Sequence, residues 1–139
     1  MASRHPPERL LELFESKTVV DLPAIKAALG GVSAMTAFRR LRKVPYRRSY
    51  NYNGRYYTLH EPSRYDRLGL WSFGDIHFSK DGNLSDTVRR LVYEAEAGAT
   101  HRELRDWLRI RVHDTLLALL RRGEVARERL AQVYVYLHA

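Results

Sequence analysis

The side chains best suited to bind another molecule lie in the first third of the chain, where Thr36, Arg39, Arg40 and Lys43 follow one another closely. At 100° per residue, a helix places these four side chains on one face. Guanidinium and ammonium groups bind phosphates, and arginine can also donate two parallel hydrogen bonds to guanine. This combination predicts a surface that binds a polyanion.

The opposite face of the same helix is apolar. Ala34, Phe38 and Leu41 fall within about 60° of arc, so we expect them to pack against a core. Ser33 directly precedes the helix, where its hydroxyl can cap the first turn. We favour this structural role for Ser33 over a ligand contact, although the free N–H groups of that turn could also bind a phosphate.

The charge distribution supports a polyanion surface in the first half of the chain. Residues 1–60 hold 11 Lys and Arg against 4 Asp and Glu, whereas residues 61–139 hold 13 against 12. Between Leu22 and His60 there are eight basic residues and no acidic one. A solvated face is the alternative, but such faces usually mix both signs. We therefore favour a surface that meets a polyanion.

Other chemistries find little support in the residue types. The chain has no cysteine, which excludes disulfides, thiol catalysis and cysteine-containing zinc sites. Its six histidines lack metal-ligand spacing, and there is no glycine-rich phosphate loop. Asp75, His77 and Asp81 lie close in sequence, but polar residues so near one another usually belong to turns. We expect no catalytic residues, no metal, no cofactor and no enzymatic activity.

The apolar runs of the chain predict no contact with a membrane. The longest, Leu116–Leu120 and Val133–Leu137, have five residues each, too few to span a bilayer. The first residues lack the apolar core of a signal peptide. We therefore expect an intracellular, cytoplasmic protein.

Residues 1–60 begin with a pattern of helices. Pro6-Pro7 can begin a first helix, and Thr18-Val19-Val20 is a short β-branched run that favours a strand. Asp21 can cap a second helix, which Gly30-Gly31 would end.

A third helix and a hairpin follow. The helix runs from Ser33 to about Lys43 and is stopped by Pro45. Tyr46–Tyr52 and Arg55–Leu59 are the expected strands of the hairpin. Asn53-Gly54 lies between them and tolerates positive φ, which favours a tight two-residue turn.

Residues 61–139 repeat this order after a connector. Three more helices and a closing hairpin are expected, with Thr100 and Glu103 at capping-box spacing. A constant shift of 79 residues aligns the halves, pairing Ile25 with Leu104, Leu29 with Leu108, Thr36 with Thr115, Phe38 with Leu117, and Leu41 with Leu120. The shared order of elements favours a duplication over chance.

Three helices followed by a hairpin resemble the winged helix-turn-helix family. The stretch from Val32 to Leu41 is similar to the recognition helix of that family, in which a capped helix bearing Thr and Arg follows a tight turn. The resemblance implies an α+β fold with two winged helices in tandem, residues 1–60 and 61–139. It also implies that the helix over residues 33–43 enters the major groove of double-stranded DNA.

In this arrangement the hairpin of residues 46–59 is the wing. Arg47, Arg48, Asn53 and Arg55 would approach the DNA backbone or the adjacent minor groove, and Tyr46 and Tyr57 would pack across the strands. Sequence recognition would fall to Arg39 or Arg40, and the sequence alone leaves the choice between them open.

The second domain is expected to differ in function. The shift of 79 residues replaces Arg39 and Arg40 by Ala118 and Leu119. We expect this largely apolar helix to be buried on more than one side, in interdomain packing or a homodimer. The alternative is a secondary DNA contact through three arginines near the preceding turn, namely Arg105, Arg109 and Arg111.

The aromatic segment Trp71–Phe78 is expected to be extended and to cover the junction between the domains. A pocket for an effector is the alternative.

The leading hypothesis is a sequence-specific double-stranded DNA-binding protein, associated with the nucleoid when bound. It would act as a transcriptional regulator or as a mobile-element accessory factor, and both roles need only the binding surface. A protein-interaction scaffold built on winged helices is one alternative. RNA binding is another, because tyrosines of the hairpin could stack on unpaired bases.

Overall fold

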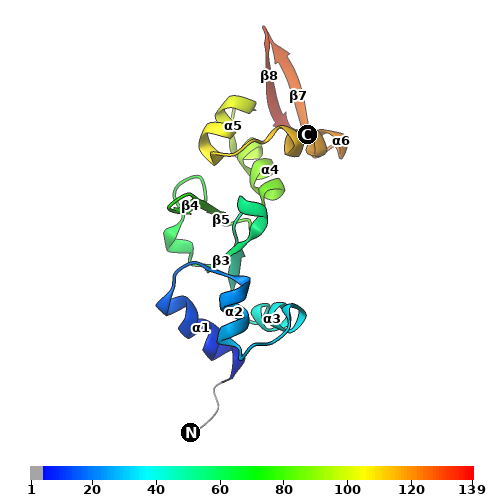
Figure 1. Ribbon diagram of the computed structural model, residues 1–139. Helices are drawn as coiled ribbons and strands as arrows, with labels where there is room; N and C mark the ends of the chain where they lie inside the picture. Colours follow the sequence, from blue (N-terminus) through cyan, green and yellow to red (C-terminus); the bar gives the residue numbers. More distant parts are fainter. Residues whose placement is uncertain (1–4) are drawn as a thin grey trace.

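The computed structural model describes residues 5–139 as an α+β fold in which all paired strands are antiparallel. The elements in chain order are α1 (Pro6–Ser16), β1 (Val20–Asp21), α2 (Leu22–Ala28), α3 (Ala34–Leu41), β2 (Tyr46–Arg48), η1 (Tyr52–Gly54), β3 (Tyr56–Leu59), η2 (Pro62–Arg64), β4 (Leu70–Phe73), β5 (Ile76–Ser79), α4 (Leu84–Glu94), β6 (Ala99–Thr100), α5 (His101–Leu108), α6 (His113–Arg121), β7 (Val125–Leu130) and β8 (Val133–His138). The molecule is elongated, with α1–α3 at one end and the β7–β8 hairpin projecting from the other (Figure 1).

Helices α1, α2 and α3 enclose a first hydrophobic core with β1 and β3. Its buried residues are Leu10, Phe14, Val20, Ile25, Leu29, Ala37, Leu41, Val44 and Tyr57. Two predicted caps position the helices: the Asp21 side chain accepts the N–H of Ala24 at 3.1 Å, and the Ser33 hydroxyl accepts the N–H of Thr36 at 3.2 Å. Local hydrogen bonds thus set where α2 and α3 begin.

Helices α4, α5 and α6 enclose a second core with β6–β8. Its buried residues are Leu70, Val88, Leu91, Val92, Ala99, Leu104, Leu108, Val112, Leu116, Leu119, Val125 and Tyr136. The predicted capping box begins α5: Thr100 Oγ1 accepts the N–H of Glu103 at 3.1 Å, and the Glu103 carboxylate accepts the N–H of Thr100 at 3.0 Å.

The two halves repeat each other in strand pairing as well as in helix order. Their three-stranded sheets have the orders β1-β3-β2 and β6-β8-β7. Val20 pairs with Tyr57, and Ala99 pairs with Tyr136. Both residues of the second pair lie 79 positions after those of the first, which is the shift that the helices predicted. The repeat therefore includes the long-range contacts that close each sheet.

The β2–β3 hairpin departs from the expected tight turn. Its paired residues are only Tyr46–Arg48 and Tyr57–Leu59, and η1 reverses the chain with positive φ at all three of its residues. The prediction of a two-residue turn at Asn53-Gly54 is therefore wrong. The segment before η1 bonds to another hairpin instead, since the N–H of Tyr50 donates to the carbonyl of His77 at 2.9 Å.

That other hairpin, β4–β5, lies between the two cores (Figure 1). The sequence predicted an extended segment here, but the chain reverses at Gly74, where φ is +61°. Asn51 holds the hairpin through Oδ1, which accepts the N–H of His77 at 2.9 Å. On the other side, the Tyr50 hydroxyl donates to the carbonyl of Leu108 at 2.8 Å. The aromatic segment Trp71–Phe78 therefore lies at the junction between the two cores, which is the position expected from the sequence.

A substitution of Gly98, which lies between α4 and β6, tests how closely the second core is packed. Its φ is +77°, and a Cβ added there would lie 2.6 Å from the carbonyl oxygen of Tyr136. Gly98→Ala should lower the free energy of unfolding by about 2–4 kcal/mol, because left-handed strain adds to overpacking. Gly123→Ala, with φ +71° and open space around it, should cost only the strain of about 1–2 kcal/mol. Denaturant titrations measure both; equal losses would contradict close packing at Gly98.

Candidate nucleic-acid interface

Helix α3 is held by one face and exposes the other. Ala37 and Leu41 are fully buried in the first core, and Phe38 is half-buried against it. The predicted packing face is thus shifted slightly, because Ala37 takes the central position and Ala34 is only half-buried. This packing fixes the orientation of the helix about its own axis.

The structure brings the four predicted binding residues of α3 together. Thr36, Arg39, Arg40 and Lys43 all line one pocket of about 480 Å³, which is completed by residues 5–7 at the start of α1. Arg39 and Lys43 are exposed, whereas Thr36 and Arg40 are half-buried. Ser33 is exposed and fills its predicted role as the helix cap.

The cations of α3 have no internal partners within residues 5–139. Neither an ion pair nor a side-chain hydrogen bond there engages Arg39, Arg40 or Lys43. Arg90 in the second half shows the contrast, with its guanidinium 2.8 Å from Asp81 and 3.1 Å from Glu94. The difference follows from the absence of acidic residues between Leu22 and His60, which leaves no carboxylate on α2, α3, β2 or β3. The positive charge of α3 is therefore free to meet an external anion.

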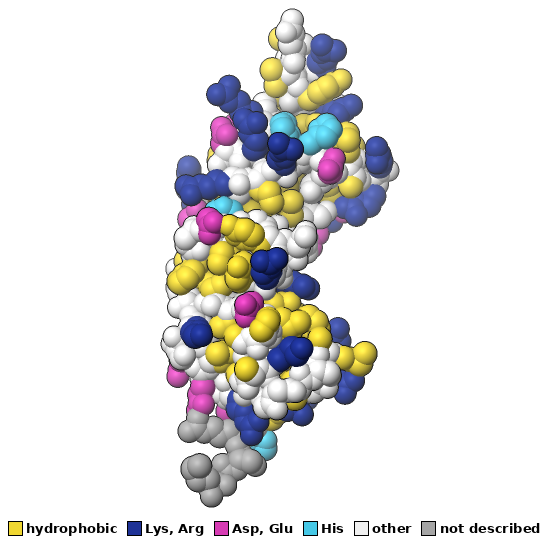
Figure 2. All heavy atoms as spheres, in the orientation of Figure 1, with side chains coloured by type: hydrophobic (Ala, Val, Ile, Leu, Met, Phe, Trp, Pro, Cys, Tyr) yellow, Lys and Arg dark blue, Asp and Glu magenta, His cyan; other side chains and the backbone are white. Residues whose placement is uncertain are grey.

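Figure 2 shows the surface charge of the first half. In the lower part of the view, Lys and Arg side chains are spread over the surface and extend to the edge formed by α3. Asp and Glu side chains are fewer there, and most lie toward the side of α1.

Two exposed residues of α3 were missed by the sequence reasoning. Met35 has 72% of its surface exposed in the first turn, and Arg42 is exposed at the C-terminal end. Met35, Arg39 and Arg42 are spaced i, i+4 and i+7, which places them on one strip of the helix. The spacing of these three residues could have predicted the strip. It was missed because Met35 has an apolar side chain, which suggests a buried position.

The structure gives the two predicted wing arginines contacts within the molecule. Arg47 donates through Nε to the carbonyl of Lys80 at 3.0 Å and through Nη1 to its neighbour, Tyr46, at 2.9 Å. Arg48 donates through Nε to the carbonyl of Gly54 at 2.6 Å, and its guanidinium lies 5.2 Å from the ring centre of Tyr57. These contacts stabilise the hairpin, so Arg47 and Arg48 are less available to bind an external anion than the cations of α3.

The other two predicted wing residues remain accessible. Asn53 is exposed in η1, with a φ of +52°, and Arg55 is exposed directly after it. Both lie in the loop that bonds to β5, so their position depends on the β4–β5 hairpin.

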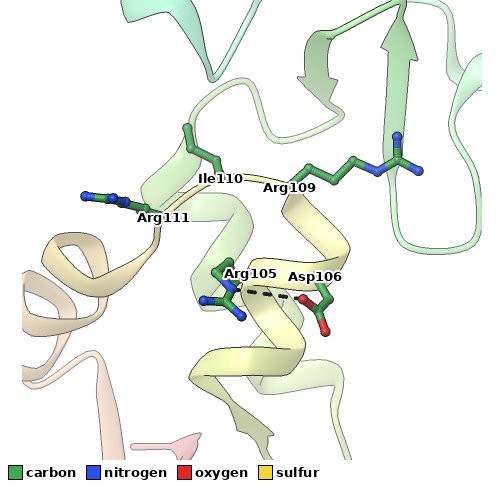
Figure 3. Close-up of a pocket in the computed structure, with 5 residues that line it drawn as sticks. All are labelled: Arg105, Asp106, Arg109, Ile110 and Arg111. Carbon is green, nitrogen blue, oxygen red and sulfur yellow. Dashed lines mark ion pairs between the residues drawn. The ribbon is translucent and has the colours of Figure 1, made fainter.

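The three arginines of the alternative contact lie around one pocket at the α5–α6 turn (Figure 3). Arg105, Arg109 and Arg111 line it with Asp106 and Ile110, and its volume is about 470 Å³. An acidic residue shares this site, since Asp106 Oδ1 lies 4.0 Å from Arg105 Nε. Arg109 reaches away from the other two arginines, toward the β4–β5 hairpin.

Helix α6 keeps only the last residue of the exposed strip of α3 as a cation, since Arg121 corresponds to Arg42 but Ala118 corresponds to Arg39. Leu119, which corresponds to Arg40, is buried with Leu116 in the second core. Leu117 and Leu120 are half-buried. Within residues 61–139, the exposed large apolar side chains are Phe73 on β4, Tyr93 on α4, and Leu130, Val133 and Tyr134 on the β7–β8 hairpin. None of them belongs to α6, so a dimer surface on α6 is less favoured than the sequence suggested.

No family model, curated protein or solved structure matches the chain. Residues 5–139 contain no group of three or more histidine and acidic side chains able to hold a metal ion. Within the same range, none of the helices has the length and apolar character needed to cross a bilayer.

The stability of the junction between the two cores should depend on pH through His77 of the β4–β5 hairpin. Burial lowers the pKa of His77 below its ordinary value of 6.5, so folding favours the neutral ring. The contribution of the buried neutral His77 ring to the free energy of unfolding is fully present above pH 6.5. It is lost as the pH falls from 6.5 through the lowered pKa. Stability should therefore decrease below about pH 6.5, and His77→Gln should reduce that decrease.

Denaturant unfolding at a series of pH values measures this dependence. His138→Gln is the control, because His138 is exposed at the end of β8. A pH dependence of unfolding that is the same in His77→Gln and in the wild type would rule out this role for His77.

Proposed function

We propose that this protein binds double-stranded DNA in a sequence-specific manner, with α3 inserted in the major groove. The observation that carries the proposal is the exposed face of α3, whose cations have no partner within the described residues. Helix α3 has eight residues, and an α-helix with its side chains is about 10–12 Å across, which fits the width of about 12 Å of the major groove.

The architecture supports the same proposal. Each half has a helix, a short strand, two further helices and a hairpin, and the short strand pairs with the last strand of that hairpin. We infer two winged helices in tandem from this order, covering residues 1–60 and 61–139. In a winged helix the third helix contacts bases, and in this chain that helix is α3.

The residues of α3 would divide the contacts between them. Arg39 is exposed at the middle of the strip that begins with Met35, so we assign base recognition to Arg39. Arg40 and Lys43 would bind phosphates beside it. Thr36, in the first turn with Ser33, would contact a base edge or the backbone. Asn53 and Arg55 would reach the flanking backbone from the wing.

The second half would support the first rather than repeat its contact, because Ala118 and Leu119 stand where the first half has Arg39 and Arg40. Regulation of transcription and assistance to a mobile element remain alternatives, since both need only the binding surface. In either role the protein would act in the cytoplasm, on DNA of the nucleoid.

Alanine substitutions on α3 test the proposal directly. Arg39→Ala should weaken binding to a selected duplex by about 1–3 kcal/mol and relax its sequence preference. Arg40→Ala should weaken binding to all duplexes alike. Arg121→Ala is the matched control, because Arg121 is exposed on α6 at the position that corresponds to Arg42. Fluorescence anisotropy with duplexes selected from a random library provides the measurement.

Salt dependence separates DNA binding from the other functions. If Arg40, Arg42 and Lys43 neutralise three phosphates, the logarithm of the binding constant should fall with that of salt at a slope of about −2.7. The absence of duplex binding at low salt would reject the proposal. Preference for single-stranded RNA would favour RNA binding, and binding of neither would favour a protein-interaction scaffold.

A second function, self-association, is favoured by the exposed tip of the β7–β8 hairpin. Leu130, Val133 and Tyr134 expose 58%, 49% and 41% of their surfaces. Adjacent exposed apolar side chains mark interaction surfaces. Light scattering should then show a dimer for the wild type and a monomer for Leu130→Ser combined with Val133→Ser. A wild-type monomer at every concentration would contradict self-association.

A further inference from the structure

A pocket of about 320 Å³ lies at the junction between the two cores. Its walls come from three parts of the chain: Tyr50 belongs to the loop between β2 and β3, Trp71 and His77 to the β4–β5 hairpin, and Trp107 and Arg109 to the end of α5. Pockets of this size, formed where separate cores meet, commonly hold small molecules.

Four of the nine residues that line this pocket carry a flat ring. Trp71 and Trp107 are the two tryptophans of the whole chain, and both line it. The ring of Tyr50 stacks on His77 with the centroids 5.7 Å apart. Indole surfaces favour a planar apolar ring, because stacking preserves contact over the whole face of the ligand.

Most of the charges in the pocket are already satisfied. Arg64 lies 4.8 Å from the ring centre of Trp71 and forms an ion pair with Glu61 at 3.1 Å. The Asp66 carboxylate accepts the N–H groups of Leu68 and Leu70 at 2.8 and 3.0 Å. These contacts leave neither charge in need of a ligand.

Arg109 is the exception. Its guanidinium forms no ion pair and no hydrogen bond within the described part of the chain. Figure 3 shows the side chain extended toward the β4–β5 hairpin, on the side of this pocket. A free guanidinium beside aromatic walls matches a carboxylate, which accepts two parallel hydrogen bonds from it.

The backbone of Arg109 is also unusual. It ends α5 with φ +58° and ψ +33°, a left-handed conformation that glycine adopts most easily. An arginine at this position therefore carries strain. Glycine would relieve this strain, but it would not place a guanidinium in the lining of the pocket.

We propose that this pocket binds a small planar aromatic carboxylate, with its ring against the tryptophans and its carboxylate on Arg109. Because both halves contribute walls, the ligand stabilises one arrangement of the halves. It thereby changes DNA binding by α3, and this regulatory step rests on the proposed function. The occupancy of the pocket does not depend on it.

Benzoate and benzamide are suitable probes because they have the same shape and differ in charge. Both tryptophans line the pocket, so intrinsic fluorescence reports binding, and calorimetry checks it without optical interference. Benzoate should give a saturable change with a dissociation constant in the millimolar range or tighter. Benzamide should bind at least about tenfold more weakly, because the charged hydrogen bond is lost. No saturable binding of benzoate, or equal binding of the two, would overturn the proposal.

Arg109→Gly removes the charge and relieves the strained backbone at once. Its thermal stability should equal or exceed that of the wild type, while benzoate binding should weaken at least about tenfold. Arg109→Gln tests the charge without the backbone change. Arg102→Gln is the control, since Arg102 is exposed on the same helix and does not line this pocket. Unchanged benzoate binding in both Arg109 variants would overturn the proposal.

Duplex binding by the same variants separates the two proposals. If Arg39→Ala leaves DNA binding intact while benzoate still binds, the proposed function fails and the pocket stands. If benzoate does not bind and Arg109→Gln weakens DNA binding, Arg109 contacts DNA and the pocket proposal is wrong. For the regulatory step, saturating benzoate should change duplex affinity in the wild type and not in Arg109→Gln.

Discussion

Tyr50 connects the two halves of the molecule. Its N–H donates to His77, its ring stacks on the same residue, and its hydroxyl donates to the carbonyl of Leu108. The side chain also packs against the second core, and burial raises the pKa of the phenol. One residue of the first half thus meets the central hairpin and α5 through polar and apolar contacts. The placement of α3 relative to the second half depends on this connection.

The same connection explains why two hairpins of equal register differ in shape. β7 and β8 pair along six residues each and project freely, whereas β2 and β3 pair only near their base. The loop of the first hairpin donates a hydrogen bond to β5 through Tyr50. Arg48 stabilises the same loop by donating a hydrogen bond to the carbonyl of Gly54. The β2–β3 hairpin is therefore part of the junction, and the unpaired cations are concentrated on α3.

The two halves show how a repeated backbone can acquire different surfaces. The shift of 79 residues preserves the N-terminal caps of α2 and α5 and the pairing of their sheets. Side chains opposite the core diverge: Arg40 corresponds to the buried Leu119. A change from cation to leucine moves the helix face from solvent into the core, because apolar burial outweighs the loss of a solvated charge. One half then exposes cations at positions where the other half buries apolar side chains.

Local interactions made much of this protein predictable from its sequence. The caps at Asp21, Ser33 and Thr100 bond within three residues, so the starts of their helices follow from residue type and spacing. The cationic face of α3 follows equally from helical periodicity, and the absence of nearby acidic residues leaves it unpaired. Tertiary structure decided the loop at Tyr50, the reversal at Gly74 and the direction of Arg109. These depend on partners tens of residues away, whose proximity is set by packing of the two cores and not by any local pattern.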